Sequence, residues 1–444
     1  MLEQNEKSLK DQAQGESQKA MLFVPYRYNR PQMLPPLICS RRLYVHLILL
    51  LVIVFMLVII RLMSTVKVNF VHFHLESDSD AELVTLPSQF AHSRGALCLD
   101  GSPPAYYFRP SLLSVKFWII YLPGGAWCNS EYDCFQRSLT ELGSSHVAKI
   151  SIPMVGILSN DCEINPDFCL WNVLVLHYCD GSSFLGNDST VRSYESQSLY
   201  LRGAVVFEAL IDYLKESTDL AEAEQVVLAG SSAGGIAALI HADRLRTMLP
   251  HSVKTVHALV DAAMFLDLPD VRGNFELANL FKSVYSFHSI ENSKSIQECT
   301  ETQPNITERW RCLLPEVYYK FVFTPIYFVN SVYDTWQRTY LLKISCFASA
   351  CPSVHRDVVY NARDSILTFA HNITRYKKNG VYLTWCPVHT ILNQLRFSSA
   401  ELGDSTVQQS LSSWLQHDLS QITGDKNFLS LEAALEVCKS SIKL

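Results

Sequence analysis

Short apolar runs alternate with longer amphipathic stretches along most of the chain after residue 96. Residues 201–215, for example, repeat apolar positions at helical spacing. Continuous apolar strands separated by helices are typical of a parallel sheet that is covered on both faces. The pattern therefore predicts an α/β fold with a mostly parallel sheet. The runs that predict its strands are 115–122, 172–178, 226–229, 256–260 and 325–329.

The first 95 residues have a different pattern. Residues 1–42 are polar and contain several prolines and arginines, which is typical of a disordered tail. Residues 43–63 are almost entirely apolar, and a helix of this length spans about 30 Å, the thickness of the hydrocarbon core of a bilayer. We expect a transmembrane signal anchor here, because no clear cleavage site follows. A buried core helix or a cleaved signal is the alternative.

The charges on the two sides of this stretch predict its orientation. Seven Lys and Arg residues precede it, whereas an acidic run at 76–82 follows it. The positive-inside rule then places the N-terminus in the cytosol. We expect a single-pass type II membrane protein with a stalk at 64–95 and a folded domain at 96–444. That domain would lie in the Golgi lumen or at the cell surface or cell wall, or would be secreted if the anchor is cleaved.

Composition narrows the choice of partners. The 444 residues are 48% hydrophobic and 18% charged, which provides enough apolar material for a large core. The net charge of −6 gives no support for nucleic-acid binding. We expect a monomer that binds no nucleic acid and meets the membrane only through residues 43–63.

The cysteines agree with a lumenal or extracellular domain. Twelve of the 13 lie beyond residue 63, and disulfides persist in oxidising compartments. Closeness in sequence suggests four bridges and the remaining cysteines suggest two more, whereas the spacing is unlike that of a zinc site. The expected pairs are Cys128–Cys134, Cys162–Cys169, Cys299–Cys312, Cys346–Cys351, Cys98–Cys179 and Cys386–Cys438. Glycosylation sequons at Asn187, Asn305 and Asn372 fit the same compartment.

The most specific motif is Gly-Ser-Ser-Ala-Gly at 230–234, which lies between an apolar run and a stretch of helical character. G-x-S-x-G in this position predicts a nucleophile elbow, a strained strand-to-helix turn that exposes the hydroxyl of its serine. The two glycines allow the backbone to pass close to its neighbours. Ser232 is therefore the candidate nucleophile of an α/β-hydrolase. A serine that only caps the following helix is the alternative.

A serine nucleophile needs a base, and the base needs an acid. In this fold the chain order is Ser, then Asp or Glu, then His. Asp334 follows the last predicted strand and is the candidate acid, with Asp261, directly after the strand before it, as the alternative. His389 lies in a late loop and is the candidate base. Position alone leaves three competitors, His355, His371 and His417.

An oxyanion hole requires two amides that point at the developing charge. The amide of Ala233 directly follows the nucleophile, and a glycine-rich loop after an earlier strand supplies the second donor in this fold. In the segment LPGGAWC at 122–128, Gly125 and Ala126 are the candidate donors, although an ordinary Pro-Gly turn is the alternative. Trp127 is a candidate wall of the acyl pocket, or a core residue.

Several segments together resemble the pectin acetylesterase family, which includes plant pectin acetylesterases and animal Notum-type carboxylesterases. They occur in the order that is typical of the family and cover about residues 97–415. The segments are 97–106, 124–128, 156–160, 165–168, 178–184, 230–235, 333–337 and 386–389.

The resemblance implies a metal-independent serine carboxylesterase without a cofactor, whose triad falls on Ser232, Asp334 and His389. The segments at 178–184 and 333–337 look closer to the plant branch, which implies removal of O-acetyl groups from a cell-wall polysaccharide such as pectin. Removal of a fatty acyl group from a protein, or a catalytically silent glycan-binding protein, is the alternative.

Two positions depart from the family pattern. The loop usually has Glu before three glycines, whereas this chain has Pro123 and, as the third small residue, Ala126. The residue before the nucleophile is commonly Cys in the plant branch and is Ser231 here. A methyl group at Ala126 would narrow the acyl side or alter the oxyanion geometry.

Overall fold

The computed structural model of the chain describes residues 50–58, 80–111, 113–346, 350–376, 378–399, 405–417, 420–424 and 430–440. The chain divides into two units, Met1–Leu75 and Glu76–Leu444. In the first unit, residues 50–58 form a helix of nine apolar side chains, each about half exposed. The rest of the anchor expected over 43–63 lies outside the described residues. None of the helices in the described ranges combines the length and the apolar character that crossing a membrane requires.

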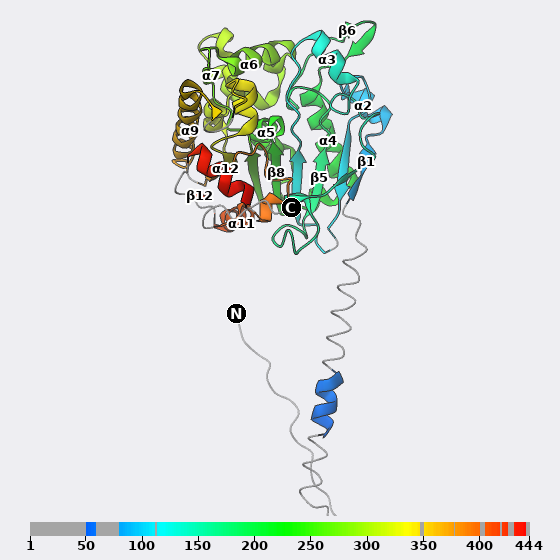
Figure 1. Ribbon diagram of the computed structural model, residues 1–444. Coiled ribbons are helices and arrows are strands. Elements are labelled where there is room, and N and C mark those ends of the chain that lie inside the picture. The colour runs from blue at the N-terminus through cyan, green and yellow to red at the C-terminus, as the bar shows by residue number, and fades with distance from the viewer. Residues whose placement is uncertain are drawn as a thin grey trace, which may run out of the picture. The chain divides into compact units, whose positions relative to one another are not determined.

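A ten-stranded sheet forms the centre of the second unit, and a separate two-stranded hairpin lies apart from it (Figure 1). The strands are β1 Asp80–Thr85, β2 Ala105–Arg109, β3 Phe117–Leu122, β4 Ser151–Pro153, β5 Asn172–Leu176, β6 Arg192–Tyr194, β7 Gln197–Leu199, β8 Gln225–Ser231, β9 Thr255–Asp261, β10 Ile326–Ser331, β11 Gly380–Thr384 and β12 Ile422–Gly424. Seven strands, in the order β12-β11-β10-β9-β8-β3-β5, are parallel. β2, β1 and β4 continue the sheet in antiparallel fashion beyond β5, and β6 pairs with β7.

Helices cover both faces of this sheet (Figure 1). The α-helices are α2 Ser88–Arg94, α3 Glu131–Ser138, α4 Gly203–Ser217, α5 Ala233–Met248, α6 Glu276–Phe287, α7 Gln297–Thr302, α8 Pro315–Tyr318, α9 Ser353–Ile373, α10 Arg396–Ser399, α11 Val407–His417 and α12 Leu431–Ser440. Short 3-10 helices are η1 Gly156–Leu158, η2 Asp219–Glu222, η3 Ile290–Asn292, η4 Lys294–Ile296, η5 Ile306–Leu313 and η6 Tyr319–Phe321, and η7 Gln337–Leu341 is a π-helix.

The side chains of the parallel strands alternate between two buried faces. Ile120 of β3 belongs to a core that also contains Phe207 of α4 and Leu239 of α5. Its neighbour Ile119 belongs to a second core, on the other face, together with Trp414 of α11. Because both faces are buried, the strands consist of continuous apolar runs. The prediction of a mostly parallel sheet with helices on both faces is confirmed.

The second unit begins earlier than the sequence suggests. Residues 80–95, expected to belong to a stalk at 64–95, form β1 and α2. β1 pairs with both β2 and β4, and Leu86 and Ala91 are buried in the core. The stalk prediction is wrong for these residues. β1 is partly exposed and contains several polar residues, so the sequence pattern does not identify it as a strand of the folded unit.

Candidate active site

The nucleophile elbow joins β8 to α5. Ser232 has φ 58° and ψ −124°, a conformation that a residue with a side chain rarely adopts, and α5 begins directly after it. A Cβ on Gly230 would lie 2.1 Å from the carbonyl oxygen of Gly234, and one on Gly234 would lie 1.9 Å from the carbonyl oxygen of Leu122. Both positions therefore require glycine. The turn packs directly against the end of β3, the strand that precedes the glycine-rich loop.

Three side chains form a continuous hydrogen-bonded series at the carboxyl edge of the sheet. His389, in the loop after β11, has its Nε2 2.9 Å from the Oγ of Ser232. Its Nδ1 lies 2.9 Å from Oδ2 and 3.1 Å from Oδ1 of Asp334, which follows β10. This is the geometry of a nucleophile, a base and an orienting acid. The structure therefore brings together the three residues that the sequence analysis selected.

The competing histidines lie elsewhere. His355 and His371 belong to α9, and His417 is the last residue of α11. His371 bonds to a backbone carbonyl of its own helix, and His355 lies near the sulfur of Cys346. Within the described part of the chain, none of the three bonds to Ser232.

The environment of His389 favours its protonated form. Burial lowers the pKa of His389, but the hydrogen bond to Asp334 and the charges of Asp334 and Asp261 outweigh burial, so that this pKa lies above the ordinary histidine value. The side chain of Asp334 is 1% exposed and that of His389 is 21% exposed. Asp334 also accepts a hydrogen bond from the amide of Gln337, which fixes its orientation. His389 is consequently a stronger base than a free imidazole.

Asp261, the alternative acid, has a different place at the end of β9. Its Oδ2 accepts hydrogen bonds from the hydroxyl of Ser231 at 2.6 Å and from the amides of Ile391 and Leu392 at 3.0 and 3.3 Å. Its backbone carbonyl accepts from the amide of Ser232 at 2.8 Å. Burial raises the pKa of Asp261 to about 6, and the hydrogen bonds act against that rise. The buried carboxylate of Asp261 thus connects the nucleophile elbow to the loop that carries His389 through hydrogen bonds to both.

The expected oxyanion loop lies against the nucleophile. A Cβ on Gly124 would lie 2.8 Å from the Cβ of Ser232, so the loop backbone passes immediately beside that serine. The amides of Gly125, Ala126 and Ala233 have no acceptor within the residues that the structure describes. All three remain available to a developing oxyanion.

Side chains behind the loop hold its peptides in place. Arg137 of α3 donates to the carbonyl of Gly125 at 2.8 Å, and the hydroxyl of Tyr178 donates to the carbonyl of Ala126 at 2.7 Å. The carbonyl and the N–H of a trans peptide point in opposite directions. The bond to Arg137 therefore turns the amide of Ala126 away from α3. Ser183 completes the support, because its hydroxyl accepts from Trp127 and donates to the carbonyl of Ala233.

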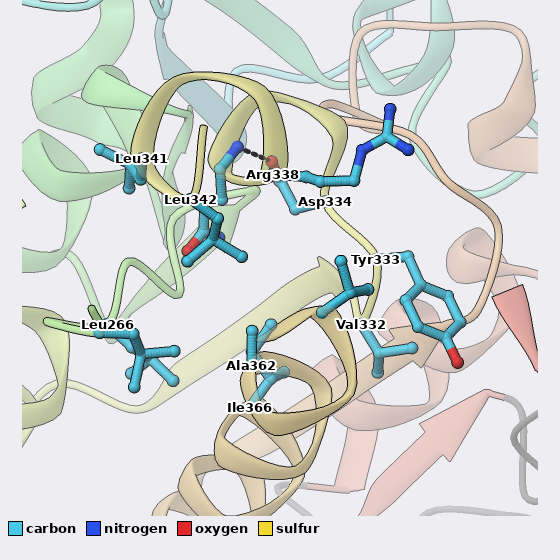
Figure 2. Close-up of a pocket in the computed structure, with 12 residues that line it drawn as sticks. Leu266, Val332, Tyr333, Asp334, Arg338, Leu341, Leu342, Ala362 and Ile366 are labelled. Atoms are coloured by element: carbon cyan, nitrogen blue, oxygen red, sulfur yellow. Dashed lines mark hydrogen bonds between the residues drawn. The ribbon is translucent and has the colours of Figure 1, made fainter. Parts of the chain in front are cut away.

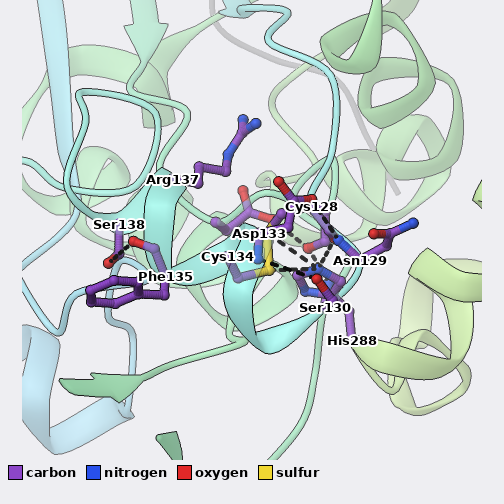
Figure 3. Close-up of a disulfide and its surroundings, with 12 residues drawn as sticks. Cys128, Asn129, Ser130, Asp133, Cys134, Phe135, Arg137, Ser138 and His288 are labelled. Carbon is purple, nitrogen blue, oxygen red and sulfur yellow. Dashed lines mark hydrogen bonds between the residues drawn. A yellow bond between two sulfur atoms is a disulfide. The ribbon is translucent and has the colours of Figure 1, made fainter. Parts of the chain in front are cut away.

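A disulfide anchors the far end of the same loop. Cys128 is bonded to Cys134 of α3, and Nε2 of His288 donates to the carbonyl of Cys128 at 2.7 Å (Figure 3). Burial lowers the pKa of His288 to about 4, so this histidine is neutral. The two sulfurs and His288 are the one group of potential metal ligands found among the described residues. Because both sulfurs form a disulfide, they are not thiolate ligands.

The family follows from comparison with known proteins. A profile described as pectinacetylesterase matches residues 76–429. Pectin acetylesterase 5 from Arabidopsis thaliana is 33% identical over 354 residues, which cover 76% of this chain and 81% of that protein. The chain belongs to the pectinacetylesterase family. It is a carboxylic ester hydrolase by that membership.

Animal relatives share the fold. A palmitoleoyl-protein carboxylesterase Notum from Schmidtea mediterranea is 27% identical over 337 residues, which cover 73% of this chain and 62% of that protein. A solved structure of the Wnt deacylase Notum from Drosophila covers 79% of this chain and 97% of its own, with a TM-score of 0.68 and 22% identity. This chain is thus similar to both plant and animal enzymes, and it shares its fold with the Drosophila structure.

The two departures from the family pattern have visible consequences in the structure. Ala126 has φ 53°, in the left-handed region where glycine is favoured, and it stands where the family usually has a third glycine. Ser231 has a hydroxyl that accepts a hydrogen bond from Tyr121 at 2.8 Å while donating to Asp261. A serine here therefore forms part of a polar network beneath the nucleophile.

Aromatic rings surround Trp127 of the glycine-rich loop and one face of His389. The indole of Trp127, which is 8% exposed, packs edge-on against Phe265 at 5.7 Å, Phe281 at 5.2 Å and Trp336 at 6.1 Å. Trp336 in turn is stacked on His389 with ring centres 5.8 Å apart. Trp127 is thus a core residue, and its packing attaches the glycine-rich loop to the interior.

A small cavity lies behind Asp334, the candidate acid. It has a volume of about 20 Å³ and is lined by Asp334 and by apolar side chains that include Leu266, Leu342 and Ile366 (Figure 2). A space of this size holds about one water molecule. It has no room for an acyl chain.

Six disulfides form, and their pairs are those expected from the sequence: Cys98–Cys179, Cys128–Cys134, Cys162–Cys169, Cys299–Cys312, Cys346–Cys351 and Cys386–Cys438. Of the sequons, Asn305 is exposed at the start of η5. Asn187 and Asn372 are partly buried, and the side-chain amide of Asn187 donates to the carbonyl of Asn292.

Sequence reasoning missed four residues that support the site: Arg137, Tyr178, Ser183 and the positioning role of Asp261. Tyr178 and Ser183 lie within the segment at 178–184, which resembles the family but carries no signal for a supporting role. Arg137 stands one helical turn after Cys134, and its direction toward the loop depends on how α3 packs. Only the folded chain reveals that relation.

We expect Arg137→Ala to lower kcat about tenfold while KM changes little. The amide of Ala126 would lose its fixed orientation, whereas loss of a direct oxyanion donor costs about 10²–10³. Arg246→Ala is the matched control, because Arg246 also donates to a backbone carbonyl, that of Val253, away from the site. Steady-state kinetics on a small acetyl ester would test this, and an unchanged kcat would contradict it.

We expect kcat/KM to fall at acidic pH with a midpoint above the ordinary histidine pKa, because His389 must be neutral to accept a proton. Asp261→Asn removes a negative charge that raises this pKa, so the acid midpoint should move to lower pH. The exposed Asp357→Asn variant should leave the midpoint in place. A pH–rate profile of all three proteins decides; a midpoint that Asp261→Asn does not lower would refute the coupling.

Proposed function

We propose that this protein is a serine carboxylesterase that removes O-acetyl groups from a polysaccharide. The observation that carries the proposal is the continuous series from Ser232 through His389 to Asp334. Nε2 of His389 takes the serine proton as Oγ attacks the acetyl carbonyl. Asp334 holds Nδ1–H and stabilises the imidazolium that forms.

The glycine-rich loop and the elbow supply the second part of the reaction. The amides of Ala233, Gly125 and Ala126 stabilise the negative oxygen of the tetrahedral intermediate. His389 then returns the proton to the leaving sugar hydroxyl, which departs and leaves an acetyl group on Ser232. A water molecule, activated by the same histidine, attacks this ester and releases acetate.

The aromatic surroundings of the nucleophile favour a short acyl group. Phe265 and Phe281 are buried and, with Trp127 and Trp336, occupy the volume beside the glycine-rich loop. A long acyl chain would have to displace several of these rings from a close-packed core, which is costly.

Relatives support a polysaccharide as the acyl carrier. Four Arabidopsis thaliana proteins named pectin acetylesterases are 30–33% identical to this chain. The matched animal Notum proteins, named palmitoleoyl-protein carboxylesterases, are 22–27% identical. The higher identity favours the acetylesterase branch, and pectin is the first polymer to test.

We expect acetate release from acetylated pectin, and Ser232→Ala should lower the rate by about 10⁴ or more because the nucleophile is absent. Acetylated xylan, a small acetyl ester and a long-chain acyl ester should be assayed beside pectin, with exposed Ser252→Ala as the matched control. Faster cleavage of the long-chain ester than of acetyl esters would favour a Notum-like deacylase. A folded protein without Ser232-dependent cleavage of any ester would favour the catalytically silent alternative.

We also propose that residues 43–63 anchor the chain in a membrane of the secretory pathway with the N-terminus in the cytosol. The described part of this stretch, residues 50–58, is helical and contains only apolar side chains, which suits a lipid environment. The six disulfides support an oxidising location for the second unit.

Full-length protein with an N-terminal epitope tests this topology in sealed microsomes. Added protease should remove the epitope and leave the disulfide-bonded unit intact, and alkaline carbonate should leave the chain in the membrane pellet. Release of the chain by carbonate would rule out the anchor.

A further inference from the structure

A π-helix begins just beyond the triad acid. Trp336 precedes η7, and Tyr340 lies within it, so the two rings come from one short segment that starts two residues after Asp334. The wide turn is closed by the amide of Leu342, which donates to the carbonyl of Gln337 at 2.9 Å. Such turns often occur at functional sites, where they change the direction of side chains.

The rings form a series that runs from the base to the protein surface. Trp336 is stacked on His389 at 5.8 Å with an angle of 23° between the planes. Tyr340 is next, with its ring centre 5.4 Å from that of Trp336 and an angle of 36°. Trp336 is partly buried, whereas Tyr340 is 58% exposed. An aromatic path therefore connects the reacting histidine with solvent.

Packing against the core explains the position of Trp336 but not that of Tyr340. The edges of Trp336 meet Trp127 and Phe265 in the core, at 6.1 and 5.5 Å, and this contact explains its inner position. Tyr340 has no comparable inward contact among the described aromatic rings except the one with Trp336, and the residue is 58% exposed. An exposed aromatic ring that is one ring removed from the candidate base is well placed to meet a ligand that carries the ester.

We propose that Trp336 and Tyr340 form a sugar-binding subsite, in which a pyranose ring of the polysaccharide stacks on the exposed ring of Tyr340 next to the residue that loses its acetyl group. The subsite rests on the proposed function, since it holds the carrier of the ester that Ser232 attacks. Sugar rings present faces of C–H groups, and the negative face of an aromatic ring attracts them. Binding of this kind depends on ring faces and tolerates variation in sugar hydroxyl groups.

Tyr340→Ala and Tyr340→Phe separate the stacking ring from the hydroxyl. On acetylated pectin, the alanine variant should raise KM about three- to tenfold, the range expected for loss of one aromatic contact, with kcat little changed. The phenylalanine variant keeps the ring and should behave like the parent protein. On a small acetyl ester, which has no neighbouring sugar, both variants should match the parent. Tyr132→Ala, which removes a ring of similar exposure from α3, is the matched control.

A binding measurement keeps the subsite separate from the chemistry. Titration of the Ser232→Ala protein with acetylated pectin oligosaccharides, followed by tryptophan fluorescence, should give a dissociation constant that rises when Tyr340→Ala is added. An equal loss on pectin and on the small ester would show that Tyr340 supports η7 rather than sugar, and would overturn the subsite. Unchanged pectin kinetics and binding would also overturn it. Sugar binding that depends on Tyr340 in a protein without esterase activity would retain the subsite and reject the proposed function.

Discussion

A single buried carboxylate, Asp261, connects the two loops that carry the proposed nucleophile, Ser232, and the proposed base, His389. Its side chain receives the hydroxyl of Ser231 and the amides of Ile391 and Leu392, and its own carbonyl receives the amide of Ser232. A buried charge is tolerated only where hydrogen bonds replace water, and here those bonds come from the groups that must be positioned. Burial raises the pKa of Asp261 to about 6. The hydrogen bonds that offset this burial are also the bonds that align Ser232 with His389.

The parallel sheet explains why these groups meet. β8, β9, β10 and β11 are adjacent, and their carboxyl ends lead to Ser232, Asp261, Asp334 and His389 in the same order. Parallel strands end at one edge, so residues far apart in sequence arrive together there. The glycine-rich loop enters from β3 on the other side of β8 and completes the site. Each of these strands therefore leads to one group of the candidate site.

Local patterns are sufficient for the elbow, the parallel strands and the four disulfides between nearby cysteines, because each depends on neighbouring residues or on a short repeat. The two long-range bridges, Cys98–Cys179 and Cys386–Cys438, follow only from the cysteines that remain. The choice between Asp261 and Asp334 was different, since both follow an apolar run. Asp261 is the last residue of its strand and its side chain is buried beneath the elbow, whereas Asp334 lies three residues beyond β10 and reaches His389. The spacing of the two residues along the chain does not show which side chain is buried beneath the elbow and which reaches His389. The supporting role of Arg137 depends in the same way on how α3 is placed.

The disulfide between Cys386 and Cys438 has a consequence for when the enzyme becomes competent. It ties the segment that carries His389 to α12, across 52 residues of sequence. That closure is complete only after ribosomal synthesis has passed Cys438 and an oxidant has acted on both thiols. His389, the proposed base, is therefore secured late in biogenesis. A chain retained in a reducing compartment would lack this restraint on its own base.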